Sequence, residues 1–171
     1  METTAEEVIR HFGLEPLPGE GGMFRRSYVA ADWIARAALP PRYAGDKPAG
    51  TAIYYLLTAE PDSFSALHAL TTDEVYHFYA GDPVEMLLLR PDGQGERVRL
   101  GAAFKSGEHV QFVVPRGVWQ GSRLAAGGQW ALLGTTMAPG YTDGDYTAGS
   151  CADLVARYPA FAAEVERLTR S

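Results

Sequence analysis

Hydrophobic and polar positions along the chain form short runs that are separated by glycine- and proline-containing turns. The continuous apolar and aromatic run at 51–58 predicts a strand that is buried on both faces. The same reasoning predicts further strands at 23–30, 64–70, 74–80, 84–90, 96–100, 110–114, 118–124 and 129–137. Short strands at intervals of about 8–12 residues are typical of a β-sandwich, a jelly roll or a small barrel, and the spacing leaves the choice among them open.

Helical patterns flank this run of strands. Either Thr3 with Glu6 or Thr4 with Glu7 can form a capping box, so a first helix is predicted over 4–12, with Gly13 as its stop. A final helix is predicted over 151–169, broken or kinked at Tyr158–Pro159. Loops are predicted at 14–22, 40–50 and 138–149. The segment 32–38 is either a short helix or a continuation of the preceding strand.

Composition and charge narrow the class of protein. A chain of 171 residues with 46% hydrophobic and 21% charged residues suits one compact domain. The net charge of −6, without a run of more than two Lys or Arg residues, argues against a nucleic-acid partner. No apolar run approaches the roughly 20 residues that span a bilayer, and the acidic N-terminal stretch is unlike a secretory signal, so we expect a cytoplasmic protein. The single cysteine, Cys151, excludes an intramolecular disulfide and a Cys-rich zinc site.

Three polar residues occupy places that a closed β-structure would bring together: His68, Glu74 and Gln120. A hairpin places the side chains of His68 and Glu74 near one another if both point inward, because side chains alternate along each strand. Alternation then also points Tyr76 inward and His77 outward, unless a one-residue bulge reverses the direction.

The spacing His68-x-Leu70-x3-Glu74-x6-Gly81 is similar to the first cupin motif, and Gly107-x7-Pro115-x-Gly117-x2-Gln120 is similar to the second. More specifically, the segments at 21–28, 51–58, 64–68, 72–93, 113–122 and 138–146 resemble the Cupin_5 family, DUF985. This resemblance implies an all-β fold, a double-stranded β-helix (cupin jelly roll) with short N- and C-terminal helices, as a single domain over 1–171. It also implies a homodimer and a structural relationship to dTDP-4-keto-sugar 3,5-epimerases.

The metal-binding positions of the cupin motifs are only partly kept. Leu70 stands at the position of the second histidine and Gln120 at the position of the third, while Arg26 replaces a glutamate in the family's N-terminal motif. If a divalent metal (Fe, Mn, Ni or Zn) binds, its ligands would be His68, Glu74 and Gln120. The alternative is a hydrogen-bonded polar cluster inside a pocket for a small-molecule ligand, and no cofactor is favoured.

The hypothesis that follows is an isomerase or epimerase acting on a carbonyl-bearing substrate, such as a sugar or sugar nucleotide. His68 would be the base, Glu74 its orienting partner and Tyr76 the acid. Substrate would be bound by Arg25, Trp119 and Gln120. The alternatives are a metal-dependent cupin enzyme of the dioxygenase or isomerase type, and a non-catalytic protein that binds a small metabolite. The competing interpretation for Tyr76 and Trp119 is packing in the core. For Arg25 it is a surface ion pair.

Overall fold

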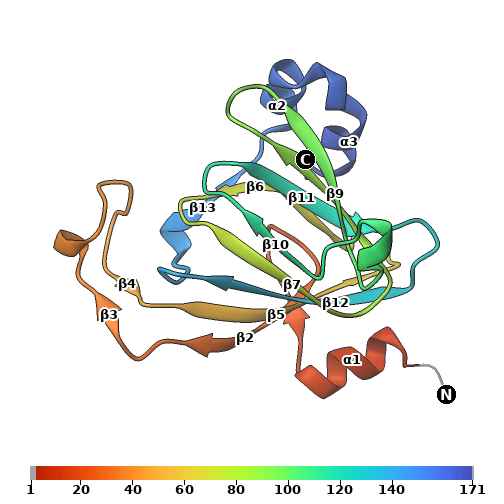
Figure 1. Cartoon of the computed structure of the whole chain (residues 1–171), viewed down its shortest axis with the longest axis horizontal. Helices are drawn as coiled ribbons and strands as arrows, with labels where there is room; N and C mark the ends of the chain where they lie inside the picture. Colours follow the sequence, from red (N-terminus) through yellow and green to blue (C-terminus); the bar gives the residue numbers. More distant parts are fainter. Residues whose placement is uncertain (1–2, 171) are drawn as a thin grey trace.

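The computed structural model describes residues 3–170, and its main feature is a pair of antiparallel sheets that face each other (Figure 1). The first sheet has six strands in the order β1-β2-β5-β12-β7-β10. Their bounds are β1 Glu15–Pro16, β2 Met23–Val29, β5 Thr51–Thr58, β12 Trp130–Met137, β7 Glu74–Gly81 and β10 Gln111–Val114. Strands that are distant in sequence are neighbours in space, as in a jelly-roll β-sandwich.

The second sheet has five strands in the order β13-β6-β11-β8-β9. Their bounds are β13 Tyr146–Ala148, β6 Phe64–Leu70, β11 Trp119–Leu124, β8 Val84–Leu89 and β9 Gly95–Leu100. The inward side chains of both sheets meet in one apolar cluster, which includes Leu57, Leu88, Leu100 and Leu133. Burial of these side chains supplies the main free energy that holds the two sheets together.

The predicted strands are confirmed, because their bounds agree with the structure to within one residue at each end. Three short strands fall in segments predicted as loops: β1, β4 (Lys47–Pro48) and β13. A fourth, β3 (Trp33–Ile34), falls in the segment 32–38, for which a short helix and a continued strand were both open. These pairings involve only two or three residues, which is too short for a period of two to be read from the sequence. Between β3 and β4 lies the 3₁₀ turn η1 (Arg36–Ala38), in the segment whose structure the sequence left open.

The helices close the outer faces of the sandwich. Helix α1 (Ala5–Phe12) begins at the predicted Thr4–Glu7 capping box and ends at Gly13, whose φ of 61° is the left-handed conformation that glycine favours. The predicted C-terminal helix is interrupted by a 3₁₀ turn that starts at Pro159, which divides it into α2 (Cys151–Arg157) and α3 (Ala162–Arg167). Within residues 3–170, no helix is long and apolar enough to cross a membrane.

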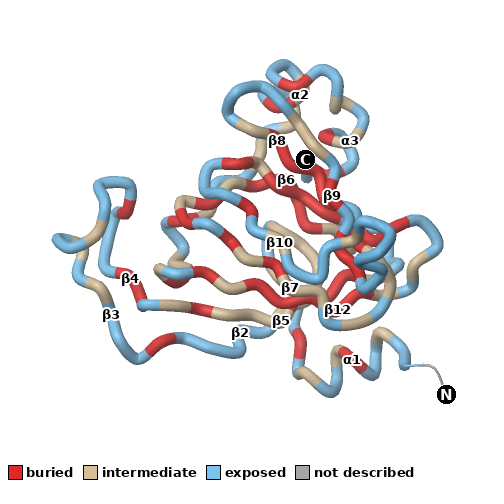
Figure 2. Tube along the Cα trace, viewed as in Figure 1, coloured by how far each residue is buried: buried red, intermediate tan, exposed pale blue. Residues whose placement is uncertain are grey.

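An arm formed by β3, β4 and their connection projects from the end of β2 and β5 (Figure 1). Most of the arm is exposed, but Tyr43, Lys47 and Pro48 are buried. Figure 2 shows the arm as mainly exposed chain. The Tyr43 hydroxyl is 2.9 Å from the hydroxyl of Thr72, in the turn between β6 and β7. The ammonium of Lys47 forms an ion pair with Asp145, in the loop before β13. The arm is therefore fixed to the two segments that border the cavity described next.

Candidate functional site

A cavity of about 280 Å³ opens between the two sheets at the end nearest the arm. It is lined by both apolar and polar side chains. The polar and aromatic members are Glu20, Phe24, Arg26, Thr51, His68, Glu74, Thr135, Tyr141, Asp143 and Tyr146. The predicted residues His68 and Glu74 thus lie in one hollow, together with groups from two loops.

His68 is the buried nitrogen base of the cavity. It lies on β6, opposite Gln120 of β11, and only 2% of its surface is exposed. Its Nδ1 is 2.7 Å from the carbonyl oxygen of Ala66. A carbonyl can only accept a hydrogen bond, so this contact places a proton on Nδ1 and leaves Nε2 with a lone pair in the neutral ring. The imidazole stacks on the ring of Tyr146, with 5.0 Å between the ring centroids.

Glu74 stands at the first position of β7 and is almost fully buried. The amide nitrogen of Gln120 donates a hydrogen bond of 2.7 Å to its Oε2. Burial raises the pKa of Glu74, and the negative charge of Glu20 adds to this, whereas His68 and the hydrogen bonds from Thr135 and Gln120 oppose it. Gln120 itself lies behind Glu74 rather than on the cavity wall. It holds the carboxylate in place.

Glu20 completes the cluster, and the sequence reasoning missed it. Its Oε1 accepts a hydrogen bond of 2.7 Å from Ser65, and its Oε2 lies 4.0 Å from Nε2 of His68. The residue belongs to the predicted loop 14–22, which has no periodic pattern. A signal does exist in the two glycines that follow it, Gly21 and Gly22, because both adopt positive φ.

The two glycines allow the loop to lie directly on the sandwich. A Cβ atom at Gly21 would come within 2.4 Å of the carbonyl oxygen of Phe64, and one at Gly22 within 2.7 Å of the Tyr55 hydroxyl. Tyr55 in turn donates a hydrogen bond of 2.8 Å to the carbonyl of Gly21. Any larger side chain would push the loop away, so these glycines are what brings Glu20 to His68.

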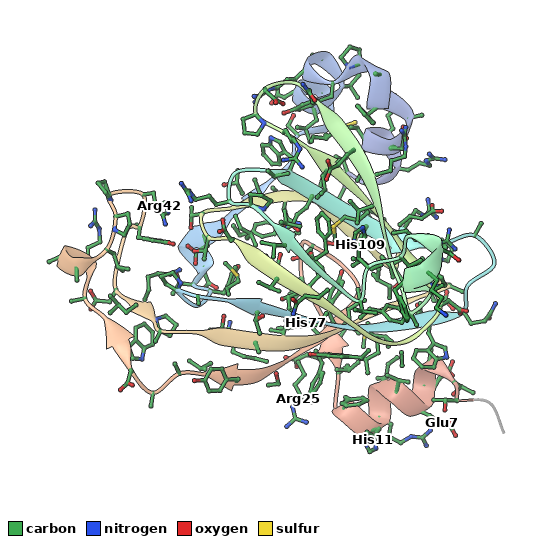
Figure 3. All side chains as sticks on the ribbon, in the orientation of Figure 1. Glu7, His11, Arg25, Arg42, His77 and His109 are labelled. Atoms are coloured by element: carbon green, nitrogen blue, oxygen red, sulfur yellow. The ribbon has the colours of Figure 1, made fainter. Side chains whose placement is uncertain are left out.

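Arg26, rather than the predicted Arg25, lines the cavity. The two residues are neighbours on β2, so they point to opposite sides of the sheet. Arg25 points out toward α1, where its Nη1 donates a hydrogen bond of 3.0 Å to the carbonyl of Phe12 (Figure 3). The expectation that Arg25 lies in the cavity is therefore wrong, and Arg26 lies there instead.

Two predicted aromatic residues also lie outside the cavity. Tyr76 points inward as expected, but it is one step deeper than Glu74 and packs in the apolar cluster between the sheets. Burial, followed by the charge of Glu74, raises the pKa of Tyr76 well above its ordinary value. Trp119 packs against the C-terminal helices on the opposite side of the second sheet. Alternation explains this, because Gln120 beside it points inward.

The phenols that do line the cavity are Tyr141 and Tyr146. Burial raises the pKa of each to about 12, and the negative charge of Glu20 adds to the effect at both, as does that of Asp143 at Tyr141. Both phenols are therefore protonated at neutral pH and can act as hydrogen-bond or proton donors. They come from the loop and short strand after β12, a segment that the sequence predicted only as a loop.

His77 faces away from the cavity, which confirms the alternation predicted for β7 (Figure 3). Its Nε2 is 2.8 Å from the hydroxyl of Thr136, and its ring stacks on Tyr79. A bulge does occur in β7, but it lies at Tyr79, beyond His77, so it does not turn the imidazole inward.

The donors present do not fit a protein metal site. Among residues 3–170, no group of three His, Cys, Asp or Glu side chains is placed to hold a metal ion. Gln120 offers its amide N–H to Glu74, and Leu70 has no donor atom. Transition metals in proteins are usually held by three or four strong donors. No step of the chemistry below is therefore assigned to a metal.

Solved structures with the same architecture cover the whole chain. A protein from Shewanella oneidensis, SO0799, is 32% identical and has a TM-score of 0.83, with 99% of each chain covered. A hypothetical protein from Leishmania major is 28% identical and has a TM-score of 0.86, with 99% of this chain and 100% of that chain covered.

The uncharacterized protein YML079W of Saccharomyces cerevisiae is 33% identical over 100 residues, which is 57% of this chain and 49% of that protein. The chain thus matches about half the length of this curated relative.

A more distant likeness extends to an enzyme. Oxalate decarboxylase from Bacillus subtilis, a protein with Mn(II) centres, is 12% to 13% identical, with TM-scores of 0.50 to 0.51. The match covers 92% of this chain and 37% to 38% of that chain. At this level of identity the likeness shows the fold alone.

The sequence matches the family Cupin_5, described as cupin superfamily (DUF985), over residues 6–148. The matched span runs from α1 to the end of β13, so it includes every residue that lines the cavity. It also includes both motifs on which the resemblance was based. The resemblance predicted from the sequence is confirmed: the chain belongs to the Cupin_5 (DUF985) family of the cupin superfamily.

Proposed function

We propose that the protein is an isomerase or epimerase that moves a proton at the carbon next to a carbonyl group of a small substrate. The observation that carries this proposal is the state of His68. Its Nδ1 is engaged by the carbonyl of Ala66, its Nε2 has a lone pair on the cavity side, and the carboxylate of Glu20 lies 4.0 Å from that Nε2. A buried imidazole with one free nitrogen is suited to act as a general base near neutral pH.

The proton transfer can be followed atom by atom. Nε2 of His68 takes the proton from the carbon next to the carbonyl, and the electron pair of the broken C–H bond moves to the carbonyl oxygen. The imidazolium that forms is stabilised by Glu20 and by the charge of Glu74. Arg26 is the cation on the cavity wall that is suited to stabilise the enolate oxygen. The electron pair then moves back from the enolate oxygen to carbon as Tyr141 delivers a proton there, in the role that the sequence assigned to Tyr76. Tyr141 regains its proton from solvent, and Nε2 of His68 releases its proton to solvent, which restores both side chains.

The cavity favours a small substrate that is not a polyanion. A volume of about 280 Å³ is at the lower limit of ligand pockets and suits a molecule about the size of a monosaccharide. Three carboxyl groups line it, those of Glu20, Glu74 and Asp143, against the single guanidinium of Arg26. A diphosphate would meet like charge here. Of the two substrate classes expected from the sequence, a free sugar or similar carbonyl compound is therefore preferred to a sugar nucleotide.

Solvent exchange at carbon tests the proposal directly. Purified protein is incubated in D₂O with a panel of aldoses, ketoses and small hydroxyketones, and loss of the proton next to the carbonyl is followed by ¹H NMR. The wild-type protein is expected to exchange that proton in at least one member of the panel. The variant His68→Asn should lose this exchange by a factor of at least about 10²–10⁴, the usual contribution of a general base.

His77→Asn is the matched control, because it makes the same substitution at a histidine that faces away from the cavity. It should exchange at the wild-type rate. Exchange that survives in His68→Asn would remove His68 from the mechanism. A panel member that binds and raises the melting temperature, but shows no exchange after long incubation, would instead identify a non-catalytic binding protein.

A further inference from the structure

A second hollow, of about 490 Å³, lies on the outer face of the second sheet, away from the candidate site. It is lined by residues of β8, β9 and β11 on one side and of helix α3 on the other. Helix α3 is fixed over the sheet by Val165 and Leu168, which pack against Leu87 and Leu89 of β8. This space between α3 and the sheet, the arginine groove, shares no lining residue with the cavity around His68.

The arginine groove is strongly cationic for an acidic protein. Four arginines line it: Arg97, Arg99, Arg123 and Arg167. Only two carboxylates accompany them, those of Glu85 and Glu164. The lining side chains carry a net charge of +2, which the carboxylate of Glu108 beside Arg99 reduces to +1, whereas the whole chain carries −6. Such a reversal of sign in a concave site concentrates anions from solution.

Two of the four guanidinium groups are already partnered, and two remain free. Arg97 donates to Glu164 of α3, and Arg99 forms an ion pair of 3.0 Å with Glu108. Within the described part of the chain, Arg123 and Arg167 form no hydrogen bond or ion pair through their side chains. Glu85 forms a second ion pair of 3.6 Å with Arg99, and it stands opposite Arg123 in the strand register without pairing with its side chain.

The base of the groove is apolar, because Leu87 and Leu168 lie there and are buried. An apolar floor lowers the local dielectric constant, which strengthens contacts between an anion and the surrounding guanidinium groups. Guanidinium groups bind phosphate oxygens through paired N–H donors of fixed geometry. We propose that the arginine groove binds a small phosphate-bearing molecule, with Arg123 and Arg167 as its principal contacts.

Calorimetric titration with inorganic pyrophosphate at constant ionic strength tests this proposal on the full chain. The wild-type protein should bind saturably with a stoichiometry of one. The double variant Arg123→Gln/Arg167→Gln should weaken binding by at least about tenfold, because it removes both guanidinium groups that are proposed as the principal contacts. The control Arg10→Gln/Arg25→Gln removes the same charge from the opposite side of the molecule, where Figure 3 shows Arg25, and should change the affinity by less than about twofold.

A third variant should raise the affinity for pyrophosphate instead of lowering it. Glu85→Gln removes a carboxylate that pairs with Arg99 and adds negative charge to the groove, so pyrophosphate should bind about two- to fivefold more tightly. The proposal is overturned if pyrophosphate shows no saturable binding up to millimolar concentration. Equal weakening by the two double variants would also overturn it, because that result would mean that only the net charge of the protein matters.

Discussion

The two ends of the space between the sheets are built by the same strands but have opposite character. On β7, the inward positions change from Glu74 at the cavity to Tyr76 and then Phe78 in the apolar cluster. On β12, Thr135 lines the cavity, whereas Leu133 lies in the cluster. The polar end is a hollow of about 280 Å³, and the other end is filled with side chains.

This difference shows how one β-sandwich can combine a stable core at one end with a polar cavity at the other. The filled end excludes water and provides hydrophobic free energy in proportion to the apolar area that it buries. The hollow end gives up part of that energy and needs other means to keep its polar groups in place. These means are hydrogen bonds such as that from Gln120 to Glu74, and the ion pair between Lys47 and Asp145.

The largest effect is expected from a cavity made at the filled end. Leu88→Ala removes a side chain that is 1% exposed and packed on all sides, so it should lower the free energy of unfolding by about 4 kcal/mol. Leu70→Ala is the matched variant at the hollow end, where the side chain already borders open space, and it should cost about 2 kcal/mol. Urea denaturation measures both. Equal losses would mean that the hollow end is as tightly packed as the filled one.

The next effect concerns the ion pair that fixes the cavity wall. Lys47→Ala leaves the carboxylate of Asp145 buried without its cation and should cost about 3 kcal/mol of unfolding free energy. Although burial acts to raise the pKa of Asp145, hydrogen bonds from Lys47, Thr71 and Thr142 hold it below its ordinary value. The stability that comes from this lowered pKa is present above the unfolded-state pKa and is lost as pH falls through the folded-state pKa.

Two measurements separate the charge effect from a loss of packing at Lys47. Adding Asp145→Asn to the Lys47→Ala variant removes the unpaired charge, so part of the lost stability should return. In a urea series at decreasing pH, the wild-type protein should lose its advantage over Lys47→Ala as Asp145 becomes protonated. If the difference between the two proteins stays constant down to pH 3, the charge of Asp145 is not what Lys47 stabilises.

The sequence predicted the strands and part of the site because both depend on local alternation. His68 and Glu74 could be placed in one hollow since each lies on a regular strand near a short turn. The same rule predicts that the neighbours Trp119 and Gln120 point to opposite sides of β11, and the structure has Trp119 against the C-terminal helices and Gln120 against Glu74. The predicted homodimer stays a prediction.

The rest of the site could not be predicted because it comes from segments without a period. Glu20 reaches Ser65, which is 45 residues away, through a glycine turn whose direction depends on contacts with β5 and β6. Tyr141 and Tyr146 lie after the last long strand, and their position depends on Asp145 and its buried partner Lys47. These contacts are long-range and irregular, so no local pattern encodes them. The Gly21–Gly22 pair marks a tight turn beside Glu20, but it does not show that the turn brings Glu20 to His68.

The smallest expected effect is a pH-dependent difference in stability between the wild-type protein and a Glu74 variant. Burial raises the pKa of Glu74 in the folded protein, so folding favours its protonated form. Its contribution to stability is fully present below the unfolded-state pKa and is lost as pH rises through the folded-state pKa. Glu74→Gln resembles the protonated acid at every pH and should not show this loss. The melting temperature of Glu74→Gln minus that of the wild type, measured from pH 4.5 to pH 8, should therefore increase as pH rises.

The increase in the stability of Glu74→Gln relative to the wild type measures how far the pKa of Glu74 is raised, because each pKa unit corresponds to about 1.4 kcal/mol. It therefore reports how strongly the hollow end is desolvated. Glu15→Gln is the control, because it removes an exposed carboxylate on β1 that does not line the cavity. It should follow the wild-type profile throughout. If Glu74→Gln also runs parallel to the wild type, the carboxylate of Glu74 is ionised in the folded protein as readily as in water. The hollow end would then be a hydrated mouth, and the low-dielectric setting that the proposed proton transfer uses would be absent.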